Sequence, residues 1–204
     1  MQLREVLSVI RRNKLVILLT VVLGLAAGWT VTALAPETYE TETKVLIEPV
    51  VSGPVAVDPG QAAAIVANQV ATYAVLAETP AVLEPAIEAS GVDVAATDLV
   101  GQVSSELIPR TSIITITVQA ETATDAADLA EAITSSLVGQ IEEASAPAAQ
   151  VGVTGRVVEP PAVPDGPSSP KLVVNLLVGL AIGLLVAFLT VVFRQALAAG
   201  SQER

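Results

Sequence analysis

Two long apolar runs dominate the hydropathy pattern, one near each end of the chain. Residues 15–34 form a stretch of 20 residues without a charge, and residues 172–193 form a second of 22. A helix of about 20 residues is about 30 Å long, which matches the hydrocarbon core of a bilayer. A helix that is apolar on every face must be buried in protein or in lipid. The pattern therefore predicts two transmembrane helices.

A cleaved signal peptide is the alternative for the first run, since Ala33-Leu34-Ala35 fits the A-x-A pattern of a cleavage site. The apolar run is, however, longer than the roughly 7–15 residues of a signal-peptide core. The residues before it also predict a helix lying at the membrane surface, from four apolar positions at helical spacing: Leu3, Val6, Leu7 and Ile10. We therefore expect the first span to be retained.

The charges next to the two spans predict their orientation. Basic residues precede the first span, including Arg11, Arg12 and Lys14, and Arg194 follows the second, whereas Lys171 stands alone on the other side. Cytoplasmic flanks are enriched in Lys and Arg, so both termini are expected in the cytoplasm. Residues 35–171, with 19 acidic and four basic residues, are then expected outside.

The segment between the spans alternates strand and helix patterns, which predicts an α+β domain. Apolar and polar residues alternate with a period of two in Ile114, Ile116 and Val118, the second strand of a predicted hairpin. Helices are predicted where alanine-rich apolar stripes recur, one of them capped by Thr122 or Thr124. The predicted elements are a strand over residues 39–50 stopped by Pro49, helices over 61–78, 80–90 and about 122–141, strands over 103–108 and 112–120, and a last strand over 151–159.

Each predicted span contains two glycines four residues apart: Gly24 and Gly28 in the first, Gly179 and Gly183 in the second. Glycines at this spacing line one helix face and allow another helix backbone to approach closely. Glycine is also common in membrane helices for other reasons, so both interpretations stay open.

Prolines recur every third residue before the second span, at Pro161, Pro164, Pro167 and Pro170. This period favours polyproline II, a stiff helix without internal hydrogen bonds. It predicts a stem that holds the domain at a set height above the bilayer, and the simpler alternative is a spacer.

The composition argues against several kinds of chemical site and partner. The chain has no cysteine and no histidine, so it lacks disulfides, thiolate chemistry and the commonest metal ligand. The net charge of −11 argues against a nucleic-acid partner. Glu142 and Glu143 suggest an acid–base pair, but adjacent helical residues point in different directions, and a solvated acidic surface is the better interpretation. No catalytic residue, cofactor or metal site is predicted.

Several short motifs, in this order, resemble the Wzz-type chain-length determinants, or polysaccharide co-polymerases, along nearly the whole chain. The order is a basic N-terminus, a first span, Tyr39-Glu40-Thr41-Glu42, Tyr73-Ala74-Val75-Leu76, Thr79-Pro80-Ala81-Val82-Leu83, the strand 113–118, Asp125-Ala126-Ala127-Asp128-Leu129-Ala130, the prolines and a glycine-bearing second span. No single motif among these is specific; the ordered set carries the resemblance.

The resemblance implies a non-enzymatic protein of the bacterial plasma (inner) membrane that assembles into homo-oligomeric rings and works with a polysaccharide polymerase or exporter. It would regulate the chain length of a capsule, an exopolysaccharide or the O-antigen of lipopolysaccharide. Some relatives carry a tyrosine kinase after the second span. Only 11 residues follow Phe193 here, so any kinase partner is expected to be a separate cytoplasmic chain. A tall bell-shaped ring is not expected, since the outer domain is shorter than in long-stalked relatives.

The expected fold class is thus two transmembrane α-helices flanking an extracytoplasmic α+β domain. Its parts are a basic N-terminal helix (residues 1–14), a first span (15–34), the domain (35–159), a proline-rich stem (160–171), a second span (172–193) and a cytoplasmic tail (194–204). Two other functions stay open: a two-pass membrane adaptor whose outer domain binds an envelope protein, and a membrane-anchored glycan hydrolase.

Overall fold

The computed structural model describes residues 11–51, 58–145 and 151–200, and the chain divides into two compact units. One unit combines the two ends of the chain, residues 1–36 and 169–204, and the other is residues 37–168. The predicted surface helix with Leu3, Val6, Leu7 and Ile10 lies outside the described residues. The expected fold class is confirmed, because two apolar helices flank a mixed α/β domain in the chain.

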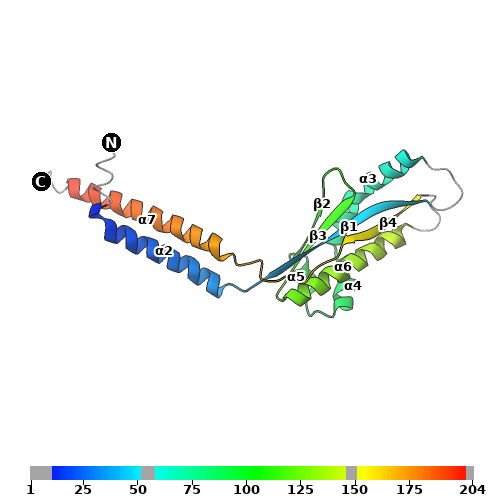
Figure 1. Ribbon diagram of the computed structural model, residues 1–204, viewed down its shortest axis with the longest axis horizontal. Helices are drawn as coiled ribbons and strands as arrows, with labels where there is room; N and C mark the ends of the chain where they lie inside the picture. Colours follow the sequence, from blue (N-terminus) through cyan, green and yellow to red (C-terminus); the bar gives the residue numbers. More distant parts are fainter. Residues whose placement is uncertain (1–10, 52–57, 146–150, 201–204) are drawn as a thin grey trace. The chain divides into compact units, whose positions relative to one another are not determined.

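The first unit is a pair of helices in contact, α2 (Lys14–Leu34) and α7 (Leu172–Gly200) (Figure 1). Both are long and apolar enough to cross a membrane by length and composition. Their large apolar side chains are mostly exposed, as Leu18, Leu23 and Phe188 illustrate. Such exposure is unfavourable in water and ordinary in lipid. Helix α7 continues to Gly200, beyond Phe193, so part of the segment predicted as a tail is helical.

The second unit contains a four-stranded antiparallel sheet in the order β2-β3-β1-β4. Its strands are β1 (Tyr39–Val51), β2 (Val103–Leu107), β3 (Ile113–Ala120) and β4 (Val151–Glu159). The hairpin of β2 and β3 forms as the sequence predicts, and its turn places Arg110 at a φ of 65°. Strand β1 lies at the centre, between β3 and β4.

Strand β1 runs further than the sequence predicts, since Pro49 does not end it. Pairing with β3 stops at Leu46 and Ile113, whereas pairing with β4 continues through Pro49, opposite Val153, to Val51. The Ile47 amide faces the β3 side, where it donates to Ser112 O. Pro49, two residues on, has its nitrogen on that same side, beyond the end of β3. The missing N–H therefore costs no ladder hydrogen bond.

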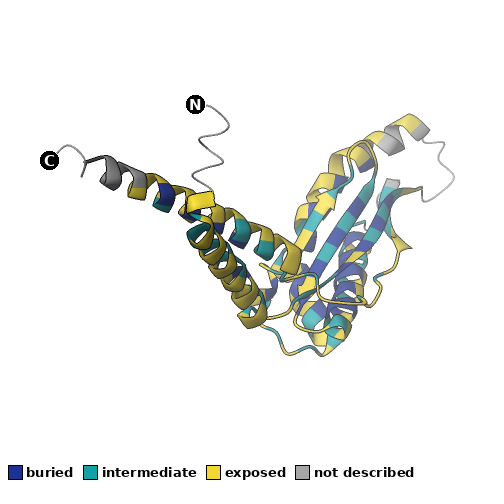
Figure 2. Ribbon diagram, turned by 60° about the vertical axis from the view of Figure 1, so that its left-hand side comes forward, coloured by how far each residue is buried: buried dark blue, intermediate teal, exposed yellow. Residues whose placement is uncertain are grey.

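Helices cover one face of the sheet, so the unit has two layers. They are α3 (Pro59–Ala77), α4 (Pro80–Ser90), the short α5 (Ala96–Leu99) and α6 (Ala123–Ala144). Helix α6 packs on β1, β3 and β4, and α3 packs on β1, β2 and β3. Buried and partly exposed residues alternate along β1 and β3, as the stripes in Figure 2 show. The face away from the helices is therefore open.

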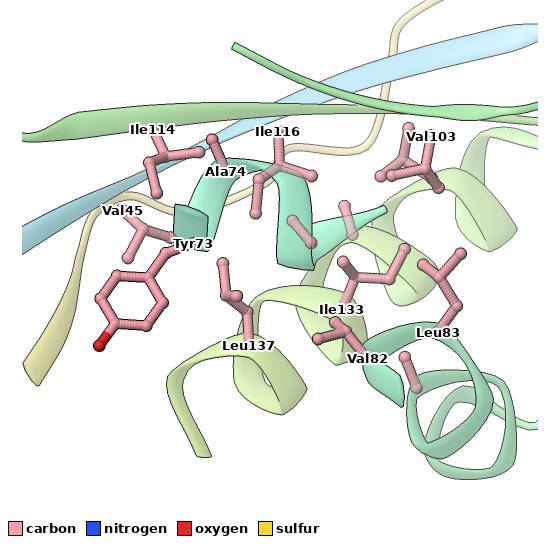
Figure 3. Packing of buried hydrophobic residues seen from close by; sticks show 14 of the residues in the cluster. Val45, Tyr73, Ala74, Val82, Leu83, Val103, Ile114, Ile116, Ile133 and Leu137 are labelled. Atoms are coloured by element: carbon pink, nitrogen blue, oxygen red, sulfur yellow. The ribbon is translucent and has the colours of Figure 1, made fainter. Parts of the chain in front are cut away.

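Among the described residues, the core between the layers is aliphatic except for Tyr73 and three buried threonines, Thr41, Thr43 and Thr134. Ile114 and Ile116 from the sheet meet Ile133 and Leu137 of α6 and Val82 and Leu83 of α4 (Figure 3). The helix ends follow local rules: the hydroxyl of Thr122 accepts a hydrogen bond from the Asp125 amide at 3.1 Å, which makes Thr122, and not Thr124, the cap of α6. Gly91 ends α4 with a φ of 69°, a left-handed conformation that glycine adopts at low cost.

Candidate functional site

The four glycines of the apolar runs meet inside a single chain, at the contact between α2 and α7. A Cβ atom added to Gly24 would overlap Gly179 O, and one added to Gly28 would overlap Asn175 O. A Cβ at Gly183 would lie 2.7 Å from Thr20 O. The two backbones thus touch, an approach that only glycine permits at these positions. We call this contact, made by Gly24, Gly28, Gly179 and Gly183, the glycine seam.

A polar contact closes one end of the glycine seam. The amide nitrogen of Asn175 in α7 donates a hydrogen bond to the hydroxyl of Thr32 in α2 at 3.0 Å. The Thr32 hydroxyl also donates to Gly28 O of its own helix at 3.0 Å. A shallow apolar groove runs beside the contact, lined by residues such as Ala27, Val31, Val178 and Ile182. The arrangement holds two helices in register and has no group suited to acid–base chemistry.

Most of the predicted stem, residues 160–171, lies in the same compact unit as the sheet. We call this part, residues 160–168, the proline strap. The strap has no regular secondary structure and is bonded to β1 and to the residue before it. The hydroxyl of Thr41 in β1 donates to Ala162 O at 2.7 Å, and the amide of Ser168 donates to O of Thr38, just before β1, at 2.8 Å. Pairing across more than 100 residues of sequence holds it there.

The individual prolines differ in their surroundings. Pro161 borders a cleft of about 200 Å³ that is also lined by Pro160, Val157 and polar residues of α6, among them Glu131 and Ser135. Pro164 is half-buried and Pro167 is exposed, whereas Pro170 belongs to the unit of the two apolar helices. The four glycines thus meet at one contact, whereas the four prolines are divided between the two units.

Sequence reasoning missed the polar residues that receive the strap. Thr41 and Thr43 occupy core-facing positions of β1, where only 6% and 0% of their surface is exposed. The signal was present in the sequence, because the alternation that places Val45 and Ile47 in the core extends back to both threonines. A buried hydroxyl requires a hydrogen-bond partner, which the strap supplies to Thr41 and the last residue of β4, Glu159, supplies to Thr43.

The open face of the sheet is acidic and carries two ion pairs. Lys44 contacts Glu159 at 2.7 Å, and Arg156 contacts Glu48 at 3.2 Å. The hydrogen bond from Lys44 to Glu159, aided by the charge of that carboxylate, raises the pKa of Lys44. Glu48 raises the pKa of Arg156 in the same way. Both cations are exposed, so these pairs contribute little to stability.

The carboxylates are not arranged as a metal site in the part of the chain that the structure describes. No group of three or more acidic residues is placed to hold a metal ion there. Glu142 accepts a weak hydrogen bond from the hydroxyl of Thr154 at 3.3 Å, and Glu143 beside it is exposed. Neither lines the cleft beside Pro161.

Comparison with known proteins bears on these features. Residues 1–89 match the Wzz family, described as chain length determinant protein. The predicted resemblance to Wzz is confirmed. The fold is similar to that of a full-length bacterial polysaccharide co-polymerase, with a TM-score of 0.58 over 97% of this chain and 99% of that chain, at 14% sequence identity. None of the curated proteins matches the sequence. The Wzz match covers α2, β1, α3 and most of α4, so it ends before the proline strap and α7.

Proposed function

We propose that the chain regulates the chain length of a bacterial cell-surface polysaccharide, as an oligomeric co-polymerase. The observation that carries this proposal is the fold likeness to a polysaccharide co-polymerase over 97% of the chain, joined to the Wzz match of residues 1–89. The polymer is a capsule, an exopolysaccharide or the O-antigen of lipopolysaccharide.

The proposed action is not enzymatic. The glycine seam is apolar, the strap contacts are hydrogen bonds to backbone carbonyl groups, and the two ion pairs of the sheet are exposed. Such groups position parts of a structure and do not activate a nucleophile or protonate a leaving group. The protein would act by presenting its outer domain to a polymerase or exporter that performs the chemistry.

The proposed location is the bacterial plasma membrane, with residues 15–34 and 172–193 crossing the bilayer. Arg11, Arg12, Lys14 and Arg194 would keep both termini in the cytoplasm, and the acidic domain would lie outside. A tyrosine kinase, where one takes part, would be a separate cytoplasmic chain. Homo-oligomers would form through surfaces other than the glycine seam, because α2 and α7 of one chain already cover those glycines.

Deletion of the gene tests the proposal. Surface polysaccharide from the deletion strain, separated by gel electrophoresis, should lose its preferred length while polymer is still made. Wild-type protein supplied from a plasmid should restore that length. An unchanged length distribution would contradict the proposal. Loss of another envelope protein, with polysaccharide unaffected, would instead identify an adaptor. Cleavage of glycan by the purified protein would identify a hydrolase.

A further inference from the structure

Two buried threonines on the central strand occupy positions where an ordinary core would have apolar side chains. The core-facing positions of β1 are Thr41, Thr43, Val45 and Ile47, and all four are buried. A buried hydroxyl without a hydrogen bond costs free energy relative to an apolar side chain of the same size. A core that needed only packing would be served by valine at both positions.

Both hydroxyls donate to backbone carbonyl groups, one inside the strap and one on the last residue of β4, directly before the strap. Thr41 donates to Ala162 O at 2.7 Å, and Thr43 donates to Glu159 O at 3.0 Å. Prolines of the strap have no N–H, so the strap cannot pair with β1 as a regular strand would. Side-chain donors from β1 therefore replace the backbone donors of a ladder.

The far end of the strap is fixed by a second contact. The amide and the hydroxyl of Ser168 both donate to Thr38 O, at 2.8 and 3.1 Å. Thr38 and Ser168 are at or next to the residues where the chain enters and leaves this unit, which spans residues 37–168. The two passages of the chain thus lie side by side at this contact.

We propose that Thr41 and Thr43 are positioning residues that hold the proline strap and the residue directly before it, Glu159, against β1, and thereby keep the entry and exit of the outer domain together at Thr38 and Ser168. Only five residues separate Ala162 from Ser168, and Pro164 and Pro167 among them limit the freedom of that segment, so the constraint at the threonines reaches Ser168. We call this fixing of the strap the clamp. Its effect on polymer length rests on the proposed function, but the clamp itself does not.

Hydrogen exchange of the Ser168 amide in the full-length protein measures the clamp directly. The double substitution Thr41→Val and Thr43→Val removes both donors and keeps side-chain volume. We expect the protection of the Ser168 amide to fall by about tenfold or more, the scale set by losing buried hydrogen bonds. Thr41→Ser with Thr43→Ser keeps the hydroxyls and should retain the protection. Thr117→Val, on the open face of β3, is the matched control and should leave it unchanged.

Unchanged Ser168 protection in the folded double valine variant would overturn the clamp. Should that variant fail to fold, the Ser168 protection is measured in Thr41→Val alone, which removes only the donor to Ala162 O. Unchanged protection there would likewise overturn the clamp. The Ser168 measurement does not depend on polysaccharide, so it stands even if gene deletion leaves the polymer unchanged and the proposed function fails.

Polymer length gives the second measurement. The double valine variant should broaden the length distribution without lowering the amount of protein in the membrane. Cysteines at Thr38 and Ser168, joined by a short thiol crosslinker in the otherwise cysteine-free chain, should restore the distribution. If the wild-type protein sets polymer length and the unclamped variant sets the same length, the positioning role is wrong.

Discussion

The side-chain amide of Asn175 donates a hydrogen bond to the hydroxyl of Thr32, and so joins α7 to α2 across the glycine seam at 3.0 Å. A polar pair inside an apolar helix contact fixes register, because sliding either helix leaves the amide without its partner. Together with the four glycines, the pair explains how two helices with few distinguishing side chains adopt one defined contact.

Breaking this pair should weaken the helix contact. Asn175→Leu or Thr32→Val is expected to cost about 0.6–2 kcal/mol, the range of hydrogen bonds between membrane helices. Thermal unfolding of the purified protein in detergent measures the loss. Thr30→Val is the matched control, since the Thr30 hydroxyl bonds only Ala26 O of its own helix. Additive effects of the two substitutions in a double-mutant cycle would show that the pair has no coupling.

Alanine at a seam glycine should separate the helices. A Cβ at Gly24 would overlap Gly179 O, so Gly24→Ala is expected to destabilise the pair by about 1–3 kcal/mol. Gly139→Ala makes the same change in α6, where a Cβ meets nothing within 4 Å, and should stabilise its helix by up to about 1 kcal/mol. Equal thermal stability of the two variants would show that close approach at the seam does not matter.

The serine at the end of α6 should prove important for the sheet edge. The hydroxyl of Ser145 donates to Val153 O at 2.7 Å and accepts from Val153 N at 3.0 Å, on the side of β4 away from Pro49. Ser145→Ala leaves both backbone groups unpaired and should cost about 1–3 kcal/mol in chemical unfolding. Ser104→Ala, at an exposed position of β2, should change stability by less than about 0.5 kcal/mol. A similar loss of stability in both variants would show that the Ser145 hydroxyl does not stabilise the edge of the sheet.

The contribution of the Lys44–Glu159 ion pair to stability should depend on pH in a distinct way. Glu159 raises the pKa of Lys44 above its ordinary value of 10.5, so the pair stabilises the fold from neutral pH up to that value. The contribution is lost as pH rises through the raised pKa, because Lys44 becomes neutral. The difference in melting temperature between wild type and Lys44→Met, small at neutral pH for so exposed a pair, should therefore vanish at high pH. A difference that persists above the raised pKa would have another origin.

Local patterns were sufficient for most of the fold. Alternation in Ile114, Ile116 and Val118 predicted β3, and the proline after Thr79 predicted the start of α4. Each of these signals depends on neighbours in the sequence. Pro49 shows the limit of such reasoning, because whether a proline ends a strand depends on which partner strands reach it.

The sequence alone could not place the proline strap or identify the partner helix in the glycine seam. The bonds that dock the strap and the residue directly before it join residues 116, 121 and 130 positions apart, a relation that no local pattern encodes. The prolines therefore suggested a stiff stem or a spacer, although the buried threonines were visible as polar residues on a core-facing stripe. The glycine spacing predicted a helix contact, but only the structure identifies the partner as the other helix of the same chain.

Membrane topology is the most direct test, since two spans with both chain ends inside place the domain where a surface polymer is assembled. The chain has no cysteine, so single cysteines can be placed at Gln2, Ser104 and Gln202 and treated with a membrane-impermeant thiol reagent on intact spheroplasts. The expected result is labelling of Ser104→Cys alone, with both end positions labelled only after the membrane is opened. Labelling of either end on intact spheroplasts, or a mature chain that lacks the first span, would contradict this topology.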